Sequence, residues 1–114
     1  MLYQLSYLGL LMMRDMVYDF PNKVAVAGGE ESQRAIAGIS DDGTQAAVLV
    51  ADLYGMDMSI PVEIKGFMPS SVTCLALDDS RSNEPVECVP DENGVYKLPK
   101  TEPGSAAFLL LLKK

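Results

Sequence analysis

The chain has 114 residues, of which 48% are hydrophobic and 22% charged, and its formal net charge is −7 at pH 7. This length predicts one domain with a single core, and the apolar content excludes an intrinsically disordered chain. Because acidic residues outnumber basic ones by sixteen to nine, the charge repels phosphate groups, and we expect neither nucleic acid nor a membrane surface as a partner.

The first predicted element is an α-helix over residues 1–18. Residues of high helix propensity dominate this segment, and its apolar residues lie around nearly the whole circumference. A helix of this kind is normally covered on more than one side, so we expect one side to pack on the domain and another to face a neighbour. The first side is the stripe of Leu5, Leu8, Met12 and Met16, and the second, the interface, comprises Tyr3, Tyr7, Leu10, Leu11 and Arg14.

This segment does not have the form of a signal peptide or of a membrane span. No basic residue precedes its apolar run, and Arg14 and Asp15 interrupt the run. A membrane span would need about twenty apolar residues. The sequence therefore indicates no particular localisation.

Short apolar or alternating runs follow, separated by stretches rich in turn-forming residues. Seven or eight such runs, at a spacing of roughly 8 to 12 residues, predict a mainly β protein in which residues 23–114 form an antiparallel β-sandwich. The expected strands are residues 23–28, 34–39, 44–53, 57–65, 72–77, 86–89, 95–98 and 105–112.

Two of these runs are apolar at consecutive positions. Residues 46–51 read AAVLVA, and residues 107–112 read AFLLLL. Strands of this type belong in the middle of a sheet that is covered on both faces, so we expect the two runs to be central neighbours.

Cys74 and Cys88 are the two cysteines of the chain. If residues 72–77 and 86–90 formed a hairpin centred near Arg81, the two thiols would lie opposite each other, close enough for a disulfide in an oxidising compartment. The other interpretation of the same pattern is that the two thiols are buried and act as small hydrophobic groups.

Pairs of acidic residues are the main candidates for catalysis, since glycoside hydrolysis uses two carboxyl groups about 5 to 10 Å apart. Each pair falls in a predicted turn, where carboxylates usually cap backbone N–H groups. The chain has no histidine, which excludes Ser-His-Asp and Cys-His triads. We therefore expect no catalytic residue, no metal site and no cofactor. The pairs are Glu30-Glu31, Asp41-Asp42, Asp78-Asp79 and Asp91-Glu92.

A carbohydrate-binding module would display aromatic rings on its surface. The chain has no Trp, and Tyr54 and Tyr96 are isolated aromatic residues outside the predicted helix. These two tyrosines are the candidate sugar ligands of an alternative function, and ordinary packing is the competing explanation.

The order of the parts resembles a known family. A "GTQAAVLVADL" strand, then "SSVTCLALDDSRSN", then a closing "LPKTEPGSAAFLLLLKK" is similar to the C-terminal tail of clan A retaining glycoside hydrolases of the β-xylosidase and α-L-iduronidase type. In that family a catalytic (β/α)₈ barrel ends in a helix and continues into a β-sandwich. Residues 2–16 would correspond to the final barrel helix.

The resemblance implies a non-catalytic domain, because the two catalytic glutamates of that family lie on barrel strands and no barrel is present in this sequence. It implies as partner a catalytic barrel or, failing that, a second copy of the chain, so that we expect a dimer in isolation. The alternative is a carbohydrate-binding β-sandwich module.

Overall fold

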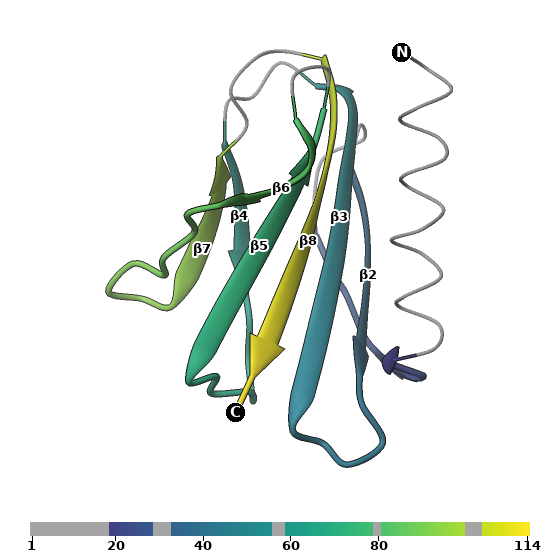
Figure 1. Ribbon diagram of the computed structural model, residues 1–114, viewed down its shortest axis with the longest axis vertical. Coiled ribbons are helices and arrows are strands. Elements are labelled where there is room, and N and C mark those ends of the chain that lie inside the picture. Colours follow the sequence, from purple (N-terminus) through teal and green to yellow (C-terminus); the bar gives the residue numbers. More distant parts are fainter. Residues whose placement is uncertain (1–18, 29–32, 56–58, 79–80, 100–103) are drawn as a thin grey trace.

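The computed structural model describes residues 19–28, 33–55, 59–78, 81–99 and 104–114 (Figure 1). These residues form eight strands in two sheets, with every strand pair antiparallel, which confirms the predicted mainly β fold. The predicted helix over residues 1–18 lies outside the described residues. The strands are β1 (Asn22–Val24), β2 (Gln33–Ile39), β3 (Gln45–Gly55), β4 (Ser59–Glu63), β5 (Ser71–Leu77), β6 (Ser82–Val86), β7 (Val95–Pro99) and β8 (Gly104–Lys113).

The two sheets differ in size and form two layers. The large sheet has six strands in the order β1-β2-β3-β8-β5-β6, and the small sheet consists of β4 and β7. The small sheet lies over one face of the large sheet (Figure 1), which we call the inner face. Because two strands cover six, part of the inner face extends beyond the small sheet.

The predicted central pair is confirmed. β8 lies between β3 and β5, and its register with β3 places Ala46 opposite Leu112 and Ala51 opposite Ala107. β3 contributes Val50 to a cluster on the inner face, whereas Leu49 belongs to a second cluster. A strand that is apolar on both faces avoids the edge of the sheet, because both of its faces need cover.

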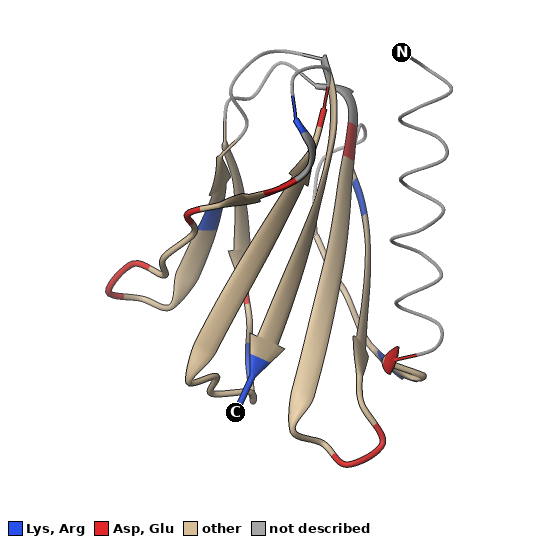
Figure 2. Ribbon diagram, in the orientation of Figure 1, with Lys and Arg blue, Asp and Glu red and all other residues tan. Residues whose placement is uncertain are grey.

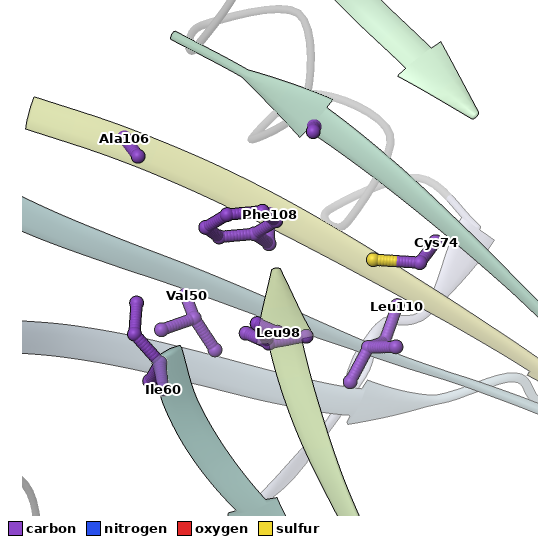
Figure 3. Packing of buried hydrophobic residues seen from close by; sticks show 8 residues of the cluster. Val50, Ile60, Cys74, Leu98, Ala106, Phe108 and Leu110 are labelled. Carbon is purple, nitrogen blue, oxygen red and sulfur yellow. The ribbon is translucent and has the colours of Figure 1, made fainter. Parts of the chain in front are cut away.

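The main core fills the space between the two sheets (Figure 3). Phe108 of β8 is fully buried there and is flanked by Leu110 and Val50 from the large sheet. Leu98 and Ile60 approach these side chains from the small sheet. Alternate residues of β8, Ala106, Phe108 and Leu110, enter this cluster, which is the pattern expected of a sandwich core.

Two predicted strands differ from the structure. The strand expected over residues 86–89 lies at Ser82–Val86, because the turn before it is tight: the Asp78 N–H donates to the Arg81 carbonyl oxygen at 2.9 Å. The strand expected over residues 23–28 ends at Val24. All three residues of β1 are exposed, and the strand pairs with β2 alone, so little burial supports a longer strand at this edge.

Candidate functional site

The second face of the large sheet is also apolar, and we call it the outer face. It carries a cluster separate from the main core, because successive side chains of a strand point to opposite faces. Leu109 of β8 is 3% exposed, and Leu49 and Leu77 flank it from the neighbouring strands. The cluster consists of Phe20, Ala47, Leu49, Leu77 and Leu109, with Leu75, Ala107 and Leu111 packed against it.

The chain enters the sheet across this outer face. Phe20 is buried in the outer cluster, and its backbone lies directly on Gly38 of β2. A Cβ atom at position 38 would lie 2.4 Å from the Phe20 carbonyl oxygen. Glycine at this position therefore permits the close approach that holds residues 19 and 20 against the sheet.

A hollow of about 460 Å³ lies on the same face beside Phe20. Its lining combines Leu75, Leu109 and Leu111 of the neighbouring strands β5 and β8 with polar residues, among them Asp19 and Lys113. Charged residues lie mostly in turns and at strand ends (Figure 2), and β5 and β8 carry none before Lys113. The apolar cluster, rather than this mixed hollow, is therefore the part of the outer face suited to an apolar partner.

A second hollow opens between the two sheets beside β2 and β4. This cleft has a volume of about 520 Å³ and is lined mainly by aliphatic side chains, among them Val24, Val48 and Val62. It is the uncovered side of the sandwich described above. Among the described residues that line it, none is aromatic.

Acidic residues of two turns act as backbone caps. The Asp42 Oδ1 accepts hydrogen bonds from the Thr44 N–H at 3.0 Å and from the Ser40 hydroxyl at 2.7 Å. The Asp91 Oδ1 accepts from the N–H groups of Asn93 and Val95, at 2.8 and 3.0 Å. These bonds stabilise the charged carboxylates: the Thr44 N–H is the main cause that lowers the pKa of Asp42 to about 2, and the Val95 N–H the main cause that lowers the pKa of Asp91.

Asp78 differs from those solvated turn residues, because its side chain is only 3% exposed. The Arg81 guanidinium donates to Asp78 Oδ2 from Nε at 2.9 Å and from Nη2 at 2.6 Å, and it lies 5.6 Å from the centroid of the Phe108 ring. The sequence reasoning expected a solvated turn here. The sequence feature that could have indicated the buried ion pair is an arginine three residues after an aspartate at the end of an apolar strand.

Asp52 was also not singled out from the sequence. It is a fully buried residue of β3 and pairs in register with Ala106 of β8. Because it is two residues from Val50, it shares the inner face with that core residue. The sequence feature that could have indicated its burial is a polar residue among apolar neighbours on a predicted strand.

The candidate sugar ligands do not form an exposed aromatic surface in the described structure. Tyr96 is 5% exposed and packs with Phe67 and Leu112, and burial is the main cause that raises its pKa. Tyr54 belongs to β3, but its side chain lies outside the described structure. Every aromatic side chain that the structure describes is buried; these are Phe20, Phe67, Tyr96 and Phe108.

Both cysteines are free thiols, and their arrangement differs in register from the expected hairpin. Cys74 of β5 lies opposite Val86 of β6, so Cys88 follows two residues later on the chain. The hairpin is centred near residue 80 rather than Arg81, which moves the partner of Cys74 by two positions. Cys88 still packs against the cluster that contains Cys74.

The remaining candidates lie outside the described residues. They are the interface side of the N-terminal segment (Tyr3, Tyr7, Leu10, Leu11 and Arg14), the pair Glu30-Glu31, and Asp79. Within the described part of the chain, no three His, Cys, Asp or Glu residues are grouped closely enough to hold a metal ion. No helix in that part is both long enough and apolar enough to cross a membrane.

The fold is similar to parts of several solved glycoside hydrolases, whereas no protein-family model and no curated protein matches the sequence. The structure of the catalytic domain of GH30 xylanase C from Talaromyces cellulolyticus matches 81% of this chain at 14% identity, with a TM-score of 0.62. A GH30 endoxylanase of Clostridium papyrosolvens matches 81% at 16% identity, with a TM-score of 0.61. A family 44 xyloglucanase of Paenibacillus polymyxa matches 80% at 13% identity, with a TM-score of 0.56.

The matched part is small in each of these enzymes. The chain covers 20%, 23% and 19% of the three enzyme chains, respectively. At these identities the likeness establishes the fold. The chain therefore has the fold of a part that makes up about a fifth of each of these larger glycoside hydrolases.

Proposed function

We propose that this chain is a non-catalytic accessory domain of a clan A glycoside hydrolase of the β-xylosidase or α-L-iduronidase type. We infer that it attaches to the catalytic barrel through the side of the molecule that bears the outer face, with the apolar N-terminal segment, expected from the sequence to be a helix, between the outer face and the barrel. The observation that carries this proposal is the apolar outer face on a sheet whose inner face already packs against β4 and β7. The similarity to about a fifth of larger glycoside hydrolases supports the same role.

The path of the chain supports the placement of residues 1–18. Residues 19 and 20 lie against Gly38 on the outer face, so the preceding segment starts from that face. As a helix, residues 1–18 would span about 27 Å. The eleven residues of β3 span roughly 36 Å. As a helix, the segment would thus run along about three quarters of the length of β3 with one side and present its other apolar side to the barrel.

Two of the four sheet edges, β4 and β6, are poorly suited to association through a further strand. Pro61 lies in the middle of β4, and Pro85 lies in β6, the last strand of the large sheet. Proline has no N–H to donate, so it interrupts the row of backbone donors that a further strand would need. Pairing with a further strand is therefore disfavoured at these two edges.

The roles of the turn carboxylates support a non-catalytic domain. A glycosidase needs one carboxyl group that stays protonated at working pH, which requires a raised pKa. The pKa values of Asp42 and Asp91 are lowered by backbone hydrogen bonds, and Asp78 is paired with Arg81. Each of these carboxylates has a structural partner that stabilises its charged form.

The test uses the full chain in isolation, where the surface that would face the barrel leads to self-association. We expect sedimentation velocity to show dimers or larger species that increase with protein concentration. Tyr7→Glu should shift the population to monomer, because it places a charge in the apolar interface. Gln4→Glu is the matched control, since it adds the same charge in the same segment at a polar position. A wild-type chain that stays monomeric at every concentration contradicts the attachment surface.

Hydrogen exchange tests the placement of the segment on the sheet. If residues 1–18 form a helix packed on the outer face, their amides should exchange slowly in the wild-type chain. Fast exchange throughout this segment would refute that packing. Turnover of aryl glycosides, or binding to oligosaccharides, would instead favour a hydrolase or a carbohydrate-binding module.

A further inference from the structure

Two thiols lie where the chain passes from the large sheet to the small sheet. Cys74 is a buried residue of β5, at 2% exposure. Cys88 lies between the end of β6 at Val86 and an isolated bridge that joins Pro90 to Tyr96 of β7. The Cys88 S–H contacts the carbonyl oxygen of Lys97 at 3.8 Å, so its side chain is directed toward the small sheet. Cys88 thus marks the point where the crossover between the sheets passes β5.

The two thiols are neighbours. Val86 is opposite Cys74, and Cys88 lies two residues further on and packs against the same cluster as Cys74. Burial is the main cause that raises the pKa of Cys74 to about 12, and the neighbouring Cys88 thiol raises it further. Burial also raises the pKa of Cys88, and the hydrogen bond from Cys74 opposes this increase.

We propose that Cys74 and Cys88 form a disulfide when the chain meets a low-molecular-weight disulfide such as glutathione disulfide, and that this bond clasps the crossover between the two sheets. Cys88 reacts first, because it is partly exposed whereas Cys74 is buried. Its thiolate attacks one sulfur of glutathione disulfide, and one glutathione leaves as thiolate. The Cys74 thiolate then attacks the Cys88 sulfur of this mixed disulfide and expels the second glutathione. Each protein thiol loses one proton, the pair is oxidised by two electrons, and glutathione disulfide is reduced to two glutathione molecules.

The disulfide would restrain a weakly held part of the fold. β6 is the last strand of the large sheet and pairs with β5 alone, and the crossover that follows it is largely exposed. A disulfide across this loop of roughly 15 residues removes chain entropy from the unfolded state, so the oxidised form should melt on the order of 10 °C higher. The raised pKa values leave few thiolates near neutral pH, so the reaction should be slow at pH 7 and faster above about pH 8.5.

The experiment incubates the full chain with glutathione disulfide at alkaline pH, followed by intact-mass and non-reducing peptide analysis. We expect the wild-type chain to lose the mass of two hydrogens, to yield a peptide linking Cys74 with Cys88, and to melt at a higher temperature until dithiothreitol is added. Cys74→Ala should instead retain a glutathione on Cys88, because no second thiol can displace it. Cys88→Ala should remain unmodified, because Cys74 is buried.

Several results would contradict the proposed disulfide between Cys74 and Cys88. A stable glutathione adduct on Cys88 of the wild-type chain would show that Cys74 cannot reach it. Disulfide-linked dimers, or an unreacted wild-type chain at alkaline pH, would also refute it. These readouts come from the wild-type chain, so they hold even if a cysteine variant fails to fold. They are also independent of the attachment to a barrel, which is tested by association.

Discussion

The buried ion pair between Asp78 and Arg81 offers a quantitative test of how the turn after β5 is held. Arg81→Met removes both guanidinium hydrogen bonds to Asp78 Oδ2, at 2.9 and 2.6 Å, and the cation–π contact with Phe108. It keeps the backbone bond from the Arg81 N–H to Asp78 Oδ1, so the loss is confined to the side chain. The side chain of Asp78 is 3% exposed and that of Arg81 is 11% exposed, so water cannot easily solvate the Asp78 carboxylate once the guanidinium is removed.

The expected loss is large compared with the stability of a domain. Removing one partner of a buried ion pair costs about 3–5 kcal/mol, because a charge is left in a poorly solvated place. Domains of this size are stable by about 5–15 kcal/mol. The melting temperature should therefore fall by roughly 15–25 °C.

A second ion pair provides the matched control. Lys65 and Glu63 are 3.8 Å apart, but their side chains are 83% and 57% exposed. Lys65→Met removes the same charge and an ion pair, yet it should change the melting temperature by no more than a few degrees. The double variant Asp78→Asn with Arg81→Met should recover part of the loss, because it removes the buried charge while an amide oxygen can still accept the Arg81 N–H. Thermal melts followed by circular dichroism measure all three variants. An Arg81→Met chain as stable as the Lys65→Met chain would refute the reasoning.

Three further substitutions test other parts of the fold. Gly38→Ala should destabilise the chain by about 1–3 kcal/mol in urea unfolding, because the new Cβ meets the Phe20 carbonyl oxygen at 2.4 Å; an unchanged midpoint would show that residue 20 moves away freely. Asp42→Ala should lower the melting temperature at neutral pH, and the difference from wild type should vanish as pH falls from 3.8 toward 2: the folded-state pKa is lowered, so the stabilisation exists above the ordinary value and is lost on protonation. Phe108→Ala should cost about 3–5 kcal/mol, and a smaller loss would indicate that the core collapses around the cavity.

The sequence predicted the strands best where the apolar pattern was strongest. β3 and β8 are apolar at consecutive positions, and both are central strands paired with each other. β6 was displaced by about four residues in the prediction. Its sequence, SNEPV, carries little apolar signal, and a tight turn at Asp78 to Arg81 decides where it begins.

The candidate sites were harder to predict than the strands. The reasoning on turn chemistry held for Asp42 and Asp91, because a carboxylate that caps backbone N–H groups two to four residues ahead is a local feature. It held only in part for Asp78, which caps the Arg81 N–H but is buried rather than solvated; its partner Arg81 lies against Phe108, from a strand about thirty residues away. Tyr96 likewise reads as an isolated ring in the sequence and packs with Phe67 and Leu112 in the fold.

The sequence by itself determined that this protein is a mainly β sandwich, that β3 and β8 need cover on both faces, and that its acidic turns cap their own backbones. These features depend on residue alternation and on contacts a few positions apart. Tertiary structure decided what lies across the sheets: the approach of Phe20 to Gly38, the apolar outer face, the burial of Asp78 with Arg81, and the meeting of Cys74 with Cys88. Such neighbours arise from strand order and register, and one shifted turn changes the partner of every residue that follows.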